Sequence, residues 1–151
     1  MQIEYPKVGV GVFIIRDDKF IMGKRKGSHG EGEYSLPGGH LEMFETFEAC
    51  CLREVMEETN LTIRGVEPLD FVNNFFRSDG KHYVTLFFTA ILDDGVEPEL
   101  TEPDKCVGWE WFKFDDLPKD MFGGTRYMCE KHFPDISWSN CRFESIVNGE
   151  K

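Results

Sequence analysis

The sequence predicts a single domain, residues 1–151, with an α/β or α+β fold in which a mixed β-sheet packs against a few helices. Three observations predict this fold. Residues 8–15 are a run of branched and small side chains, which is typical of a buried central strand. Residues 46–59 have the length and the end signals of a helix. Two apolar runs further along the chain are separated by turn-forming residues 78–80, which predicts a hairpin.

The segments that follow the first strand are defined by their turn residues. A turn at residues 17–18 leads from this strand into a second strand at residues 20–24. Residues 25–33 are rich in glycine, serine and charge, so we expect a loop there. Residues 34–36 are expected to be short and extended, because Pro37 disfavours a helical residue before it.

The predicted helix has recognisable ends, and the rest of the chain alternates strands with turns. Thr46 is suited to cap the helix N-terminus, and Asn60 can adopt the left-handed conformation that ends helices. Beyond the helix we expect the hairpin strands at residues 69–76 and 83–92, followed by an acidic loop at residues 93–104. A strand with one buried face is expected at residues 109–114, a turn at residues 115–118 and a final helix at residues 124–132. In the tail, Ile136, Trp138 and Phe143 indicate that it packs somewhere.

Composition excludes several classes of partner. The 17 basic and 28 acidic residues give a formal charge of -11, which repels a nucleic acid polymer but not a small anion bridged by metal ions. No apolar run approaches the roughly 20 residues of a membrane span, and we see no secretory signal. The five cysteines form no ligand-spaced pattern, and their odd number favours reduced thiols in a cytoplasmic protein.

Three glutamates of the predicted helix define the candidate site. Glu54, Glu57 and Glu58 stand three and four positions apart, so a rotation of about 100° per residue places them in one sector of the helix. Phe47, Cys50 and Cys51 fall in the same sector. Clustered carboxylates at the edge of a core repel one another unless cations neutralise them. An acidic helix end is more often a solvated surface, which two glutamates alone would favour, but the longer pattern described below favours a metal site.

The ligand type indicates the metal and the substrate. Carboxylate oxygens suit Mg²⁺ or Mn²⁺, and Mg²⁺ completes its shell with water and substrate phosphate. Arg53 lies one turn before Glu57 and can also reach back toward Glu45, so it is a candidate for holding these carboxylates in place.

The spacing around the helix resembles the signature of the Nudix hydrolases. The pattern begins at Gly39 and continues through Glu45, Arg53 and the three glutamates to Leu61. Asn60 stands where the family usually has glycine, and asparagine is the next best residue for a left-handed helix end. The likeness extends over most of residues 8–128, where stretches such as residues 23–27, 36–42, 82–85, 102–105 and 109–111 are similar to MutT-related nucleoside triphosphate diphosphatases.

The resemblance implies a fold, a metal and a reaction. Members of this family place a loop-helix-loop on a mixed sheet in an α/β/α sandwich, and their Mg²⁺ activates water for attack on a phosphoanhydride. Glu54 and Glu58 would then be the main metal ligands, with Glu57 a third ligand or the residue that orients water and Gly38 a backbone ligand. The candidate catalytic residues are therefore Glu54, Glu57 and Arg53, and which glutamate takes the proton stays open.

The resemblance also implies a substrate and an assembly. We expect hydrolysis of canonical, oxidised or otherwise modified purine nucleoside triphosphates to the monophosphate and pyrophosphate, by a homodimer. Lys24 and Arg25 would meet phosphates. His40, which follows the glycine pair, contacts phosphate, acts as a base or makes a structural hydrogen bond. The full set of candidate substrate-binding residues is Lys24, Arg25, Leu36, Gly39, His40, Thr85, Phe122 and Gly124. Gly123 stands where a related enzyme has a large aromatic residue, which implies a base pocket of different shape.

Two alternatives compete with this interpretation. A pyrophosphohydrolase of the same fold can act on ADP-ribose or a nucleotide sugar, and it would release no inorganic pyrophosphate. A Nudix domain can also bind a nucleotide without turnover, although such domains usually lose one of the glutamates that this chain keeps. The sequence leaves open which base or linked group is the physiological substrate.

Overall fold

Strand β1, Lys7–Arg16, is the centre of the sheet, as its run of apolar residues predicts. Its residues from Gly9 to Ile15 are all buried. It pairs in parallel with β6, Lys81–Ile91, along most of its length, and antiparallel with β2, Lys19–Arg25. A central strand covered on both faces has to be apolar throughout.

The computed structural model describes residues 2–27 and 29–134, which form a mixed seven-stranded sheet and two α-helices. The main strand order is β3-β2-β1-β6-β5, with β4 paired to β1 and β7 paired to β2. The remaining strands are β3, Tyr34–Ser35; β4, Gly38–His40; β5, Arg64–Phe76; and β7, Cys106–Lys113. A 3-10 turn, η1, Arg77–Asp79, closes the hairpin between β5 and β6.

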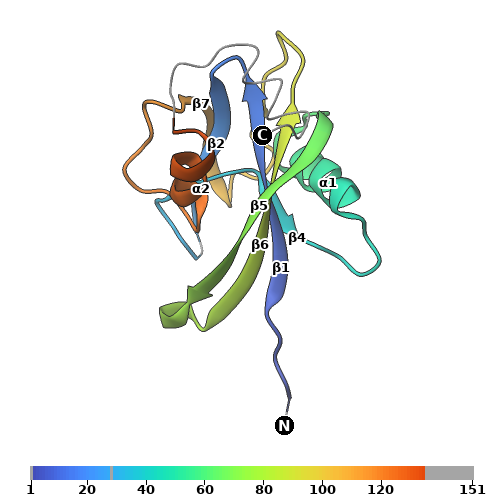
Figure 1. Cartoon of the computed structure of the whole chain (residues 1–151), viewed down its shortest axis with the longest axis vertical. Helices are drawn as coiled ribbons and strands as arrows, with labels where there is room; N and C mark the ends of the chain where they lie inside the picture. Colours follow the sequence, from blue (N-terminus) through green and yellow to red (C-terminus); the bar gives the residue numbers. More distant parts are fainter. Residues whose placement is uncertain (1, 28, 135–151) are drawn as a thin grey trace.

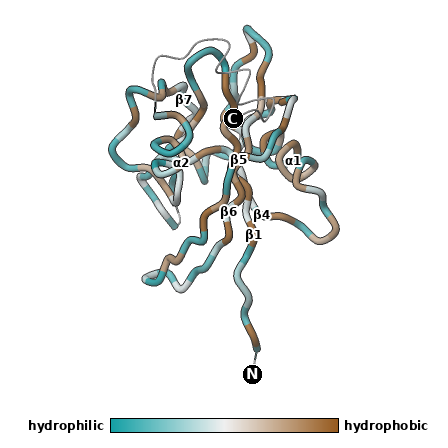
Figure 2. Tube along the Cα trace, viewed as in Figure 1, coloured by the Kyte–Doolittle hydropathy of each residue, from teal (hydrophilic) through white to brown (hydrophobic). Residues whose placement is uncertain are grey.

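The two helices lie on opposite sides of the sheet (Figure 1). Alternate residues of β1 explain the two layers: Val12 and Ile14 pack in the cluster that contains Cys51 of α1, Phe47–Thr59. Phe13 and Ile15 pack on the other side, in the cluster that contains Met128 and Cys129 of α2, Thr125–His132. Figure 2 shows the hydrophobic residues along β1 in the middle of the sheet. The arrangement is the predicted sandwich of helix, mixed sheet and helix.

The ends of α1 are those that the sequence predicts. The Thr46 hydroxyl accepts a hydrogen bond of 3.1 Å from the Ala49 N–H, which satisfies a backbone donor of the first turn. Asn60 has φ 58° and ψ 27°, the left-handed conformation, and its N–H donates to the Met56 carbonyl. Both caps fix where the acidic face of the helix starts and stops.

Three expectations differ from the structure or fall outside it. β5 begins at Arg64, ahead of the expected residue 69, because pairing with β6 continues past Pro68 through irregular register. The glycine pair forms the unexpected strand β4, because β1 offers it a free edge. The packing predicted for the tail, residues 135–151, lies outside the described residues. Among the described helices, none is long and apolar enough to cross a membrane.

Candidate active site

The acidic face of α1 is directed onto strand β4. The Gly38 N–H donates a hydrogen bond of 2.7 Å to Glu58 Oε1. A side chain at Gly39 would overlap the Glu54 carboxylate, so only glycine allows the acid to approach the strand this closely. The glycine pair and the glutamates, which the sequence places 15 to 20 residues apart, therefore form one site.

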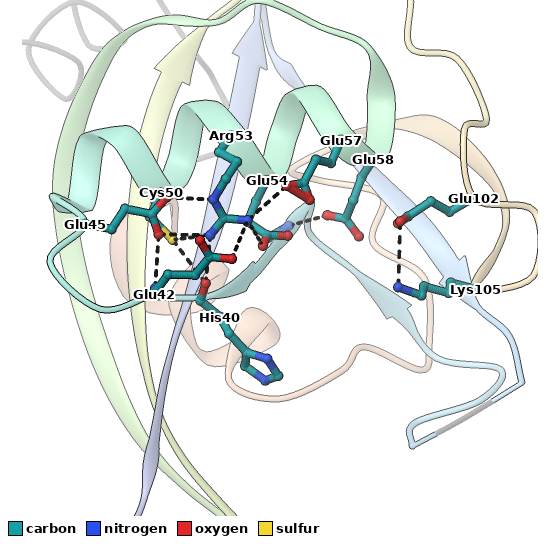
Figure 3. A network of polar contacts seen from close by, with 11 residues as sticks. His40, Glu42, Glu45, Cys50, Arg53, Glu54, Glu57, Glu58, Glu102 and Lys105 are labelled. Carbon is teal, nitrogen blue, oxygen red and sulfur yellow. Dashed lines mark hydrogen bonds and ion pairs between the residues drawn. The ribbon is translucent and has the colours of Figure 1, made fainter.

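Arg53 connects the carboxylates to one another (Figure 3). Its Nε and Nη2 atoms lie 2.6 Å and 2.9 Å from the two carboxylate oxygens of Glu45, the bidentate contact that the sequence predicts. Its Nη1 atom donates to Glu54 at 2.6 Å and to Glu57 at 3.1 Å, and Nη2 also reaches the His40 carbonyl at 3.0 Å. One guanidinium thus fixes the loop before the helix and two of its acids.

Burial sets the protonation of these acids. Removal from water, together with the charges of Glu54 and Glu102, raises the pKa of Glu58 to about 8 against the opposing effects of the Gly38 hydrogen bond and the Arg25 charge. Burial also raises the pKa of Glu54, whereas the Arg53 guanidinium lowers the pKa of Glu45 to about 2. Glu45 is therefore a fixed anion that anchors Arg53, and Glu54 with Glu58 form a pair that an additional cation would stabilise as anions.

A fourth glutamate, Glu102, faces this pair from the opposite wall (Figure 3). It lies in the loop before β7 and forms an ion pair of 3.7 Å with Lys105. Residues 102–105 resemble the family, but the sequence gives no signal that Glu102 belongs to the site. No local spacing connects it to α1, because the loop reaches the helix through tertiary contacts such as the 2.9 Å hydrogen bond from the Glu99 N–H to the Thr59 carbonyl.

The residues present fit a divalent cation. The donor set consists of carboxylate oxygens, the ligands of Mg²⁺ and Mn²⁺, and its two most buried members are destabilised as free anions. In the described part of the chain, no group of three or more His, Cys, Asp and Glu side chains is already gathered into a ligand set. The reason is that Arg53 holds Glu54 and Glu57, while Gly38 holds Glu58. Mg²⁺ needs only one or two protein carboxylates.

A cavity of about 640 Å³ extends from the acidic face of α1. It contains most residues that the sequence assigns to metal or substrate: Gly38, Glu54, Glu57, Glu58, Arg25, Leu36, Gly39, His40, Thr85, Phe122 and Gly124. Lys24 is different, because it is exposed and does not line the cavity. Adjacent strand residues point to opposite faces, so Arg25 and Lys24 of β2 cannot both face the same cavity. Arg53 lies behind the wall and contacts the acids from there.

The far end of the cavity is aromatic. The rings of Phe76 and Phe122 are stacked, with centroids 5.4 Å apart and planes 7° apart. The Arg25 guanidinium lies 3.9 Å from the centroid of Phe122, and the charge of Glu58 acts on the same guanidinium. Arg25 therefore stands between the acidic and the aromatic ends. Sequence reasoning missed Phe76, because an apolar residue at a strand end gives no signal of a ligand.

Two polar contacts line the side of the cavity. The Asn74 amide donates to the Thr85 hydroxyl at 3.2 Å, which joins neighbouring positions of β5 and β6. The His40 ring stacks on Tyr83, with centroids 5.4 Å apart, and its Nε2 lies 3.1 Å from the Tyr83 hydroxyl. Burial, with Lys7 and Lys81, lowers the pKa of His40, which favours its neutral form. His40 makes this structural contact while its ring still lines the cavity.

The helix cysteines belong to the core. Cys50 and Cys51 are fully buried on the face of α1 that packs against the sheet, and burial raises the pKa of each thiol to about 12. A thiolate nucleophile is absent at such values. Phe47, which the sequence places on the same face, is half-exposed in the first turn of the helix, although its ring contacts Phe88 of β6.

A mixed sheet that carries a glycine loop, an acidic helix and a cavity with an aromatic end defines the class of phosphoanhydride hydrolases. The comparisons agree with this class. The NUDIX domain family matches residues 5–131 of the chain. The solved structure of a MutT NUDIX hydrolase from Burkholderia pseudomallei has a TM-score of 0.79 and 34% identity, and covers 85% of this chain and 98% of its own.

Two curated relatives are a pyrophosphatase and a hydrolase by name. An ADP-ribose pyrophosphatase of Methanocaldococcus jannaschii is 32% identical over 118 residues, which are 78% of this chain and 68% of that protein. An NAD-capped RNA hydrolase, NudC, of Photorhabdus laumondii is 30% identical over 121 residues, 76% of this chain. The chain spans only 42% of the length of that second relative. The chain belongs to the Nudix hydrolase family, and its enzyme class is that of a Nudix pyrophosphohydrolase.

Proposed function

We propose that this Nudix hydrolase is a Mg²⁺-dependent nucleoside triphosphate diphosphatase, which converts purine triphosphates, including oxidised or modified ones, to the monophosphate and pyrophosphate. The observation that carries the proposal is the polarity of the cavity. Four glutamates lie at one end, two stacked phenylalanines at the other, and Arg25 lies between them. A nucleotide has the same polarity, with phosphates at one end and a flat base at the other.

Two lysines beside the acidic end favour a triphosphate. Lys26 and Lys105 line the cavity, and their segments are joined by a backbone hydrogen bond of 2.9 Å from the Lys26 N–H to the Lys105 carbonyl. Lys105 forms an ion pair of 3.7 Å with Glu102. Two ammonium groups that line this cavity suit the charge that accumulates on a departing pyrophosphate.

The metal and its ligands follow from the donor set. We assign Mg²⁺, with Mn²⁺ as a substitute, to Glu54 and Glu58, with Glu57 as a third ligand or as the residue that orients water, and with Gly38 beside them. When bound, the ion supplies a water of lowered pKa and neutralises phosphate charge. Arg53 holds Glu54 and Glu57 in position, so its guanidinium is a positioning group. Glu102 adds a carboxylate from the opposite wall.

The aromatic end accommodates the base. A base that enters beside Phe76 and Phe122 gains stacking area, and Leu36, Thr85 and Gly124 line the adjoining wall. Arg25 reaches the phosphates from beneath Phe122.

A second candidate is hydrolysis of ADP-ribose or another nucleoside diphosphate that is linked to a sugar. The relative from Methanocaldococcus jannaschii, named an ADP-ribose pyrophosphatase, favours it. The two candidates share the metal site and differ in the group that leaves.

Product analysis separates the candidates. The protein is incubated with Mg²⁺ and a panel of ATP, GTP, oxidised and thio-substituted purine triphosphates, and ADP-ribose. We expect pyrophosphate and a nucleoside monophosphate from at least one triphosphate. Release of AMP and ribose phosphate from ADP-ribose, with no pyrophosphate from any triphosphate, would establish the second candidate in its place.

Two further expectations concern the assembly and the location of the protein. We propose a homodimer, for which the exposed Phe71 and Phe75 of the edge strand β5 offer an apolar surface, and sedimentation would measure the mass. The cysteines among the described residues are unpaired, which suits a reducing cytoplasm.

A further inference from the structure

His29 joins the loop after β2 to the tip of the β5–β6 hairpin. Its Nδ1 atom lies 2.5 Å from Oδ2 of Asp79, which belongs to η1. Its side chain is only 10% exposed, and the residue lines the cavity. The backbone is held as well, because the His29 carbonyl accepts a hydrogen bond of 2.8 Å from Arg25 Nε.

Asp79 determines which ring nitrogen is left for a ligand. An ionised carboxylate can only accept hydrogen bonds, so the proton of a neutral His29 ring is on Nδ1. Nε2 then has a free lone pair. In residues 2–27 and 29–134 this buried nitrogen has no hydrogen-bond partner. A buried acceptor without a donor is unfavourable, and most such groups in proteins are satisfied.

The ring that carries the unsatisfied nitrogen is at the aromatic end of the cavity. The His29 ring stands edge to face with Phe76, with centroids 4.4 Å apart and planes at 85°, and with Phe122 at 5.1 Å and 81°. These two phenylalanines form the stack to which the proposed function assigns the base.

We propose that His29 is a specificity-determining residue, whose Nε2 accepts a hydrogen bond from an N–H group on the edge of the substrate base. Asp79 and Arg25 act as positioning residues that hold the ring and its backbone. The inference rests on the proposed function, because it requires a substrate with a base. The chemistry selects bases with an amino or ring N–H over the same ring system without one.

The test uses a pair of nucleotides that differ in this N–H alone. AMP and purine riboside 5′-monophosphate share ring, sugar and phosphate, and only AMP has the exocyclic amine. Binding of both is measured by calorimetry with Mg²⁺ at pH 8. We expect AMP to bind the wild-type protein at least about 10-fold more tightly than purine riboside 5′-monophosphate does, since one hydrogen bond contributes roughly this factor. The same ratio is expected for kcat/KM with the two triphosphates.

Variants decide whether His29 causes the preference. His29→Phe keeps an aromatic ring against Phe76 and Phe122 but removes both nitrogens, and we expect the AMP preference to fall close to one. Asp79→Ala frees the ring and should reduce the preference in part, without change at the acidic site. His82→Phe is the matched control. His82 lies on β6, contacts Phe75 and Asn73, and does not line the cavity.

The outcomes separate this inference from the proposed function. A preference that is absent in the wild type, or unchanged in a folded His29→Phe variant, overturns the role of His29. Lack of turnover of every triphosphate overturns the proposed function, and the binding ratio still decides the role of His29. The thermal midpoint of each variant shows whether it is folded.

Discussion

Glu58 is the residue in which burial, charge and position coincide. It accepts a hydrogen bond from the Gly38 N–H, lies beside Glu54 and faces Glu102. Its pKa is raised to about 8, mainly by burial. Such an acid is retained at a cost in stability, and acids of this kind cluster at functional sites. In the proposed mechanism its charge is needed to hold the metal.

Glu58→Gln tests that role. The amide keeps the shape of the side chain but removes the negative charge, so we expect kcat for pyrophosphate release to fall by about 10²-fold or more. The matched control is Glu48→Gln, at an exposed position of the same helix outside the cavity. Activity of Glu58→Gln equal to that of the control would refute the assignment.

Arg53 acts on the site indirectly, by positioning other residues. It lies outside the cavity but contacts Glu45, Glu54 and Glu57, so its effect on the reaction is through their positions. The sequence predicts the contact with Glu57 from its spacing, because residues four positions apart are neighbours on a helix, and it predicts that Arg53 can also reach back to Glu45.

At the scale of elements, the two glycines of β4 have different functions. A side chain at Gly38 would overlap the backbone carbonyl of Val10 in β1, which cannot move without disturbing the sheet. A side chain at Gly39 would overlap the carboxylate of Glu54, the flexible end of a side chain. One glycine is therefore required by the fold and the other by the site.

Alanine at each glycine separates these functions. Gly38→Ala should lower the thermal midpoint by several degrees or prevent folding, because backbone atoms overlap. Gly39→Ala should stay folded with a midpoint near that of the wild type, while pyrophosphate release falls because Glu54 is displaced. Calorimetry and the pyrophosphate assay measure both properties, and a large loss of stability in Gly39→Ala would contradict this account.

The elements themselves were predictable to different degrees. The strand at β1 and the helix α1 with both caps were expected from local patterns. β4 and the early start of β5 were not, because each depends on a free strand edge supplied by another part of the chain. Local sequence defines whether a segment suits a strand, and the neighbouring strand decides where it begins.

At the scale of the whole molecule, Asp70 connects β5 to α2. Its Oδ2 lies 2.8 Å from Lys131 Nζ and 2.7 Å from His132 Nε2. The hydrogen bonds from Lys131 and His132 hold the pKa of Asp70 well below its usual range. These contacts fix α2, and with it Phe122 and Gly124 before the helix, against the sheet.

The pH dependence of stability follows from this shift. A carboxyl whose pKa is lower in the folded than in the unfolded chain stabilises the fold above the unfolded pKa, and this contribution declines as the pH falls below it. Asp70→Asn should therefore cost on the order of 1 kcal/mol of unfolding free energy at pH 7, since the group is partly screened. The difference should shrink between pH 4 and pH 2. Urea unfolding of both proteins measures it, and a difference independent of pH would rule out an electrostatic origin.

The sequence by itself determined the acidic helix, its caps, the glycine pair and Arg53, and with them the Nudix family and the candidate metal site. These features are set by spacings of a few residues, which fix the geometry of a single helix and its flanking loop. Only the tertiary structure decided that Glu102 faces Glu58, that Phe76 stacks on Phe122, and that Asp79 holds His29. Their partners lie more than 40 residues away in the chain, so the order and register of the strands bring them together, and no local pattern records that pairing.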